Sequence, residues 1–442
     1  MERQNRTLGQ LFVPICFETL FYMLAGVVDT LMLSSVSDQA VGAVGTANTY
    51  IGMFIIMFSV ITSGMLAVMT QNIGAGKSGI AYQALQIGVA FNTVLGIVLG
   101  IVLFASSGSI LHIVGIAYLL LKPADTYLKI VGGFCIFNAL IPIFSGYLRA
   151  FGYTKQPLIA AVVGNVLNFG LNSLFLFVFH WGVAGVAIAT IISKVVNLTI
   201  VVIQAKLLIH AKADKHRASG KHILKQIIRI GLPSAMETAL YNVAMTLVIR
   251  FLNQMDPDGL NVTARSYTTQ ITNFSYSVGS ALAQANAIMT GWRIGSGDYE
   301  ACDKGTKKAA LVGIIVATVL EGIFTLSGGI IMKLFSDDPV MVHLVIKLLA
   351  IDIVLEMGRV SNLVFGNALK AAGDVIFPMV IAAIFMYLFA VGGTYVFGIR
   401  LGLMAVGSYI GLAMDECVRA IGMFLRWRGG KWKSMSLVSN QN

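Results

Sequence analysis

The chain has 442 residues, of which 57% are hydrophobic and only 12% charged, and its mean hydropathy is +0.82. Soluble domains carry about 25% charged residues, so the composition excludes a soluble globular protein and predicts one whose main partner is the lipid bilayer. The net charge of +11 does not indicate nucleic-acid binding, because the basic residues are spread over many short loops without interleaved aromatic residues.

Twelve windows of about 20 apolar residues, the length that spans a bilayer, follow one another along the chain. They begin near residues 10, 45, 83, 125, 157, 183, 230, 267, 308, 342, 378 and 402. Three of them, those near 230, 342 and 402, also contain the acidic residues Glu237, Asp352 and Asp415. The sequence therefore predicts an all-α polytopic membrane protein with twelve transmembrane helices.

The first span carries two acidic residues, Glu18 and Asp29. A charged side chain at bilayer depth costs about 2.5–3.5 kcal/mol on the insertion scale, so such residues usually face a cavity or a partner. The two acids are eleven residues apart, close to three helical turns, which places them on one face of the helix. Asn48 adds a polar position to the second span.

An amide stripe marks the fifth span, where Asn165, Asn168 and Asn172 follow one another at i, i+3 and i+7. Amides suit either hydrogen bonds between helices or coordination of a small cation, and the sequence leaves both interpretations open. Thr190 adds a hydroxyl group to the sixth span. The first half therefore gathers a polar set inside the membrane.

A basic, polar segment separates the two halves. We interpret residues 1–207 as an N-terminal six-helix lobe, 208–229 as a cytoplasmic basic linker and 230–442 as a C-terminal six-helix lobe. Three histidines in the linker do not indicate a metal site, because no cysteine accompanies them and lysines flank them. The four cysteines of the chain follow neither a disulfide nor a zinc spacing.

The two halves repeat one another. The pattern P-x3-E-T-x2-Y that begins at Pro14 returns at Pro233, and L-[RK]-A-x-G-x4-P returns from Leu148 at Leu369, at offsets of 219 and 221 residues. A third, shorter match lies between them. Both halves run in the same direction, and a parallel repeat in an apolar chain is typical of two-lobed transporters. We therefore expect two pseudo-symmetric six-helix bundles.

The second half is not a copy of the first in its polar residues. At the 219-residue offset, Asp29 corresponds to Val248, and the amide stripe has no amide counterpart. The second half instead offers Glu237, Arg250, Asp352, Glu356 and Arg359. The last three share one helical face, and we favour an internal ion-pair network there over substrate contact. Glu237 and Tyr241, from the repeated pattern, join Asn48 and Asn165 as candidate substrate contacts.

Lysines and arginines concentrate in the loops on one side of the predicted membrane. With an even number of spans, that side holds both chain ends and the linker, whereas the opposite loops carry little beyond Lys122, Arg265 and Arg400. The positive-inside rule then predicts that both termini are cytoplasmic. We expect a multi-pass protein of the cell membrane.

The ordered set of motifs resembles the multidrug and toxic compound extrusion (MATE) family over nearly the whole chain. The motifs are residues 28–30 (VDT), 40–45 (AVGAVG), 71–76 (QNIGAG), 148–152 (LRAFG), 182–187 (GVAGVA) and 369–374 (LKAAGD). The resemblance implies an exporter of small cationic or amphiphilic compounds that works by alternating access and is driven by a proton or sodium gradient. It also implies no cofactor, and we expect a monomer.

The resemblance further implies a cation-coupling site in the first half at Asp29, Asn168, Asn172 and Thr190. Relatives have an aspartate where this chain has Asn172, so the site holds one carboxylate. That carboxylate could accept H+, or it could balance Na+ held also by Asn168 and Asn172; we favour the proton, because two amides make a sparse sodium cage. Some branches use acids on spans seven and ten, but Glu237 and Arg359 do not match those positions, so we carry no role over to them.

Three other readings compete with an exporter. A related superfamily branch flips lipid-linked precursors on a similar scaffold, but such flippases tend to have further spans and a cavity rich in arginine and lysine. A receptor or scaffold without transport would gain nothing from acids inside the membrane. An intramembrane enzyme is not expected, because the sequence holds no phosphate loop and no recognisable nucleophile–base pair.

Overall fold

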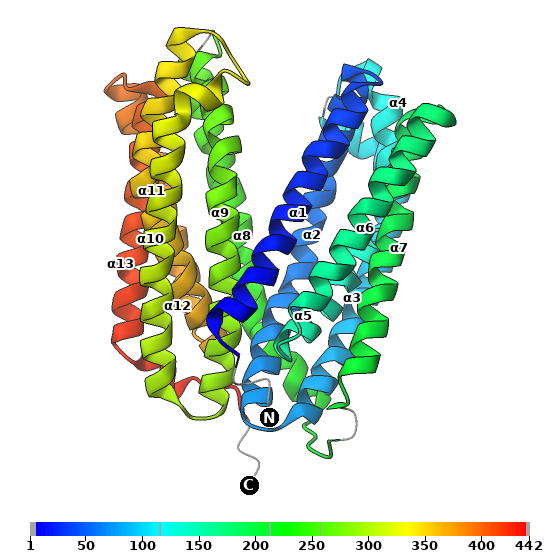
Figure 1. Cartoon of the computed structure of the whole chain (residues 1–442), viewed down its shortest axis with the longest axis vertical. Coiled ribbons are helices and arrows are strands. Elements are labelled where there is room, and N and C mark those ends of the chain that lie inside the picture. Colours follow the sequence, from blue (N-terminus) through cyan, green and yellow to red (C-terminus); the bar gives the residue numbers. More distant parts are fainter. Residues whose placement is uncertain (1–5, 115, 212–213, 257, 439–442) are drawn as a thin grey trace. The chain divides into compact units, whose positions relative to one another are not determined.

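The computed structural model describes residues 6–114, 116–211, 214–256 and 258–438. Every regular element within these ranges is helical (Figure 1). Contacts between residues divide the described chain into two compact units, one ending at Leu232 and the other running from Pro233 to Val438. We call them the first unit and the second unit and describe each by itself.

The helices of the first unit follow the six spans expected from the sequence. In chain order they are α1 (Leu8–Ser34), α2 (Asp38–Gly74), α3 (Ser78–Val114), α4 (Tyr118–Tyr127) with the π-helical turn η1 (Leu128–Gly132), α5 (Ile136–Ala150), α6 (Lys155–Ser173) with the π-helical turn η2 (Leu174–Val178), and α7 (Gly182–Leu208). The fourth span is bent by 43° between its two helical parts, Tyr118–Gly132 and Ile136–Ala150.

The second unit supplies the other six spans. They are α8 (Gly220–Met255), whose first turns belong to the first unit, α9 (Leu260–Gly295), α10 (Tyr299–Met332), α11 (Pro339–Ala372), α12 (Ile376–Phe385) with the π-helical turns η4 (Met386–Val391) and η5 (Thr394–Arg400), and α13 (Met404–Arg428). A short 3-10 turn, η6 (Lys431–Ser434), follows. The predicted all-α, twelve-span layout with two repeats is confirmed.

Not all twelve spans are equally apolar. Among the described residues, eight helices are long and apolar enough to cross a membrane, or nine when the bent fourth span is counted as one. The helices that miss this standard include α9, α11 and α13. In the second unit α11 packs against α9, α10 and α13, so polar side chains on these helices are covered by neighbouring helices rather than by lipid.

The repeated sequence patterns have a structural meaning at their glycines. Gly76 and Gly297, at equivalent positions of the repeat, end α2 and α9 with φ of 76° and 79°. Gly152 and Gly373 do the same after α5 and α11, with φ of 80° and 97°. Side chains strongly disfavour this left-handed conformation, so each repeated glycine allows a turn that the two units share.

Each unit also contains an ion pair at equivalent positions of the repeat. Glu18 of α1 pairs with Arg149 of α5 at 2.7 Å, and Glu237 of α8 pairs with Lys370 of α11 at 2.8 Å. All four residues belong to the repeated patterns. We conclude that the repeat encodes a common framework that ties the first span of each half to the end of a later one.

The segment between α7 and α8 is shorter than the 208–229 linker of the sequence interpretation, because α8 already begins at Gly220. The first turns of α8 are basic, but they also carry an apolar stripe. Its residues are 0–1% exposed: Ile223, Ile227 and Ile230. The stripe packs on α2: a Cβ atom on Gly64 of α2 would collide with the carbonyl oxygen of Ile227. Close helix packing at a glycine therefore accompanies a helix in the part of the chain that the charge pattern predicted to be a linker.

Candidate functional site

The predicted coupling residues lie on α1, α6 and α7 of the first unit. Helix α6 packs against both α1 and α7 (Figure 1). A Cβ atom on its Gly164 would stand 3.4 Å from the Asn197 side chain, an ordinary van der Waals distance, so α6 and α7 lie in contact there. Asp29 lies eleven residues after Glu18 on α1, about 16 Å along the helix at 1.5 Å per residue. Asp29 is thus well separated from the Glu18–Arg149 framework pair.

Asn172 joins the predicted residues into one cluster. Its Nδ2 donates to Asp29 Oδ1 at 2.8 Å and to Asn168 Oδ1 at 3.1 Å. Asn172 is fully buried and Asn168 is 8% exposed. Asn172 Oδ1 has no hydrogen-bond partner among the described residues, so it remains available as an acceptor. The cluster can therefore hold a carboxylate by one amide hydrogen while keeping a second oxygen open.

Thr190 takes part through a tyrosine that the sequence analysis did not single out. The Thr190 hydroxyl donates to the Val186 carbonyl of its own helix at 2.8 Å. The hydroxyl of Tyr127, a residue that is 5% exposed, interacts with the side chains of both Thr190 and Asn48, and its charge environment includes Asp29. Tyr127 thus connects the fourth span and Asn48 to the cluster.

Lys194 of α7 is the second residue that sequence reasoning missed. It lies one turn after Thr190, near the middle of the Gly182–Leu208 helix, and interacts electrostatically with Asp29. The same rule that drew attention to Asp29, a charge inside an apolar span, was sufficient to find it. With both groups ionised, the ammonium and the carboxylate give this region no net charge.

The other predicted substrate contacts fall in different places. Asn165 lies on α6, and its buried Nδ2 has no hydrogen-bond partner in the described part of the chain. Glu237 and Tyr241 belong to the second unit, where they line a cavity of about 160 Å³ together with Arg359, Lys370 and other residues. The structure therefore gathers Asp29, Asn168 and Asn172, connects Asn48 and Thr190 through Tyr127, and places Glu237 and Tyr241 in a separate cavity.

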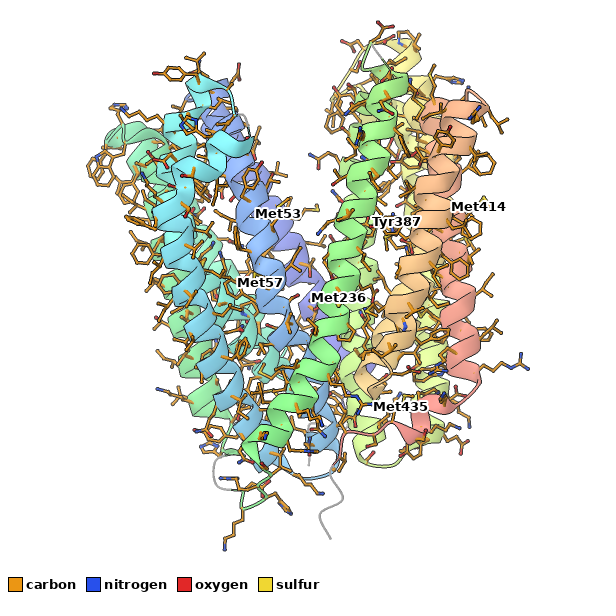
Figure 2. All side chains as sticks on the ribbon, turned by 180° about the vertical axis from the view of Figure 1, so that it is seen from behind. Met53, Met57, Met236, Tyr387, Met414 and Met435 are labelled. Atoms are coloured by element: carbon orange, nitrogen blue, oxygen red, sulfur yellow. The ribbon has the colours of Figure 1, made fainter. Side chains whose placement is uncertain are left out.

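One wall of that cavity comes from the π-helical turn η4. Met386 lines the cavity, and the hydroxyl of the adjacent Tyr387 donates to the Leu240 carbonyl of α8 at 3.3 Å (Figure 2). This bond joins η4 to the helix that carries Glu237 and Tyr241. The Glu237 carboxylate is held by Lys370 at 2.8 Å.

The predicted ion-pair network on α11 is present in part. Arg359 pairs with Glu356 on its own helix and approaches Glu416 of α13 at 3.6 Å. Arg419 of α13 pairs with Glu416 and with the adjacent Asp415, each at 2.7 Å. Asp352, expected to be part of the network, instead has a buried Oδ2 without a hydrogen-bond partner among the described residues.

Nothing in the described residues resembles a conventional metal centre. No group of three or more His, Cys, Asp or Glu side chains there has an arrangement that could hold a metal ion. The predicted sodium ligands Asp29, Asn168 and Asn172 comprise one carboxylate and two amides, and both Asp29 Oδ1 and Asn168 Oδ1 already accept a hydrogen bond from Asn172.

Comparisons with known proteins agree with the fold. The family profile described as MatE matches residues 14–174 and 233–396. The chain is 33% identical to the uncharacterized transporter YisQ of Bacillus subtilis, over 95% of this chain and 93% of that protein. It is 23% identical to the probable multidrug resistance protein NorM of Thermotoga maritima, over 99% and 95% of the two chains.

Solved structures give the same result. A multidrug resistance MATE family transporter of the MOP superfamily, in an outward-facing conformation, superposes with a TM-score of 0.88, 20% sequence identity and 96% coverage of both chains. A MOP superfamily transporter from Pyrococcus furiosus superposes with a TM-score of 0.86 at 20% identity, over 97% of this chain and 96% of the other.

Proposed function

The chain belongs to the MatE family of membrane transporters, and from this premise we propose that it is a secondary active antiporter that exports small cationic or amphiphilic organic compounds. In the proposed cycle the substrate crosses by alternating access while a cation moves down its gradient through the first unit. The protein acts as a monomer in the cell membrane, with both termini in the cytoplasm.

The observation that carries the proposal is the contact between Asn172 and Asp29. A carboxylate within an apolar helix is costly unless it serves a function or has a partner. Here its partner is a neutral amide, which donates to Asp29 Oδ1 at 2.8 Å. The amide stabilises the charged form without neutralising it, so Asp29 can still bind and release a cation.

The hydrogen bonds favour H+ as the coupling ion. A sodium ion needs several oxygen atoms directed at it, yet the Asn172 amide hydrogens occupy one oxygen of Asp29 and that of Asn168. A proton needs only the second oxygen of Asp29. The positive charge of Lys194 near Asp29 also opposes a second, permanent cation in the same region.

The composition of the first unit also favours an exporter over the flippase alternative. Its interior site consists of one acid, amides, a threonine and a tyrosine, with Lys194 as the basic residue that interacts with Asp29. Such a site suits a small cation better than the phosphate groups of a lipid-linked precursor, which arginine and lysine bind preferentially.

The direct test is efflux of a fluorescent cation from proteoliposomes under an imposed proton gradient. Asp29→Asn keeps the shape of the side chain and should abolish gradient-driven efflux while the protein remains folded in the membrane. Asp38→Asn, an exposed aspartate at the start of α2, is the matched control and should transport normally. Efflux at the wild-type rate from Asp29→Asn would refute the proposal.

A further inference from the structure

A buried acid on α10 lies outside the site described above. Glu321 is located within the Tyr299–Met332 helix, and its side chain is completely buried (0% exposed). Neither of its carboxylate oxygens has a hydrogen-bond partner among the residues that the structure describes. The apolar α10 passes beside α9 and α11 within the second unit (Figure 1), so neighbouring side chains surround the acid.

Two of the four groups that face Glu321 are acidic. From α11 they are Asp352, Glu356 and Arg359, and from α9 the hydroxyl of Ser275. Asp352 is 2% exposed, Glu356 0% and Ser275 1%. Asp352 Oδ2, Glu356 Oε2 and Ser275 Oγ all lack hydrogen-bond partners within the described chain. Several unsatisfied oxygens thus lie in the buried surroundings of Glu321, and unsatisfied polar groups are rare in protein interiors.

The nearby arginines are already paired with carboxylates other than Glu321 and Asp352. Arg359 pairs with Glu356 and approaches Glu416, and Arg419 binds Asp415 and Glu416. No ion pair to Glu321 or Asp352 is present in the described residues. A buried carboxylate without a partner is far costlier than the neutral acid, so in practice such a group neutralises. The arrangement of the three acids does not suit a metal ion, which leaves a proton.

We propose that Glu321 carries a proton and shares it with Asp352 and Glu356, and that these three residues form a proton-binding site of the second unit distinct from Asp29. The protonated acid can donate to one unsatisfied carboxylate oxygen and accept from Ser275. These two hydrogen bonds pair four of the five open oxygens and leave one carboxylate oxygen, of Asp352 or of Glu356, without a partner.

Arg359 connects the proton site to the cavity of the second unit. This arginine pairs with Glu356 on the side of the proton site and lines the cavity of about 160 Å³ with Glu237 and Lys370. Loss of the proton adds negative charge behind Arg359 and draws the guanidinium away from the cavity. Gain of the proton releases the guanidinium towards the cavity. The charge in the cavity therefore follows the protonation of Glu321, Asp352 and Glu356.

Infrared spectroscopy of the purified full-length protein in lipid nanodiscs tests the proposal. At neutral pH the wild type should show a C=O band of a protonated carboxyl group, and Glu321→Gln should remove one component of it. Glutamine preserves the size and hydrogen-bonding capacity of a protonated glutamate. Glu300→Gln, an exposed residue of the same helix that pairs with Lys304, is the control and should leave the band unchanged.

A second variant keeps the test decisive if Glu321→Gln fails to fold. Ser275→Ala removes only the hydroxyl that faces Glu321 and should shift the frequency of the same band. Ser266→Ala, an exposed serine of the same helix that bonds to the Val262 carbonyl, should not shift it. A band that persists at full amplitude in Glu321→Gln, or that ignores Ser275→Ala, overturns the proposal.

The outcome is independent of the proposed transport function. Asp29→Asn should stop efflux yet keep the Glu321 component of the band, because Asp29 belongs to the first unit. Loss of that component in Asp29→Asn would show that the assigned acid is Asp29 and would also overturn the proposal.

Discussion

The two units share a framework but differ in what they bury inside it. Both place a glutamate of the first repeated helix against a basic residue, Glu18 on Arg149 and Glu237 on Lys370. Where the first unit has Asp29, however, the repeat puts Val248 in the second, and Val248 is fully buried. The repeated residues hold the bundles together, whereas our proposals assign the chemistry to residues that differ.

The difference extends to how buried charge is handled. The first unit has a sparse site, in which one carboxylate is held by an amide with a lysine as the electrostatic counterpart. The second unit has a dense network, in which Arg359 and Arg419 each contact more than one carboxylate and Glu321 has no ion pair within the described chain. A sparse site can exchange one ion with little rearrangement, while a dense network couples many groups at once.

The largest effect is expected from breaking the shared framework. Removing one partner of a buried ion pair typically costs about 3–5 kcal/mol, because the other charge is left buried. Glu18→Ala should approach this range, since the Glu18 side chain is only 5% exposed, and Glu237→Ala should cost less, since its side chain is 21% exposed. Thermal unfolding in detergent would measure both, with Glu300→Ala in the exposed pair as the control. Equal losses in the two units would show that burial does not distinguish the pairs.

The next largest effect concerns the amide that only the first unit has. A hydrogen bond to a charged group is worth about 1.5–3 kcal/mol, so Asn172→Ala should lower proton-driven efflux by roughly 10–100-fold and shift its pH profile. Transport should stay insensitive to sodium. Ser173→Ala, on the same helix, removes only a hydroxyl that bonds to the Phe169 carbonyl and should have a much smaller effect. A sharp loss of sodium dependence in Asn172→Ala would instead indicate sodium coupling.

A smaller effect is expected from the internal lysine. Lys194→Gln removes the positive charge that interacts with Asp29, so a sodium ion could then be balanced by Asp29 alone. Efflux should become sensitive to sodium by up to about tenfold, equivalent to about 1.4 kcal/mol. Lys206→Gln, an exposed lysine near the end of the same helix, serves as the control. If Lys194→Gln remained indifferent to sodium, the lysine would have no role in ion choice.

The smallest effect lies outside the membrane. Burial alone would raise the pKa of the Asp214 carboxyl, but hydrogen bonds from the backbone N–H groups of His216 and Gly79 outweigh it and lower that pKa below its ordinary value. A carboxyl group with a lowered folded-state pKa stabilises the fold at neutral pH, and this contribution disappears as the pH falls towards the folded pKa. Asp214→Asn should therefore cost about 0–1 kcal/mol at neutral pH and nothing in strong acid.

Unfolding of that variant at both pH values, beside Asp258→Asn in another loop, measures the effect. An equal loss at neutral and acidic pH would show that the charge of Asp214 contributes nothing.

The helices and the repeat could be predicted from the sequence, because long apolar windows indicate membrane-spanning helices and the spaced glycines recur in both halves. The start of α8 could not, since Ile223, Ile227 and Ile230 are scattered through a basic run and become a stripe only on a helix that packs against α2. The spacing of Asn168 and Asn172 predicted one face, but the contact to Asp29 depends on how α1 packs against α6.

Two ionisable residues inside apolar spans show a different limit. The sequence shows Lys194 and Glu321 as single charges within apolar spans, but it does not show what these charges do. Their importance follows from their neighbours, Asp29 in one case and Asp352 with Glu356 in the other. Such neighbours come from other helices, which a single sequence does not bring together.

The central claim is that the sparse site of the first unit couples export to a proton. The most direct measurement is efflux of a fluorescent cation from proteoliposomes containing the wild-type protein, with proton and sodium gradients imposed separately. We predict that an inward proton gradient alone drives efflux, that a sodium gradient alone does not, and that Asp29→Asn abolishes the proton-driven component. Sodium-driven efflux that survives a collapsed proton gradient would contradict the claim.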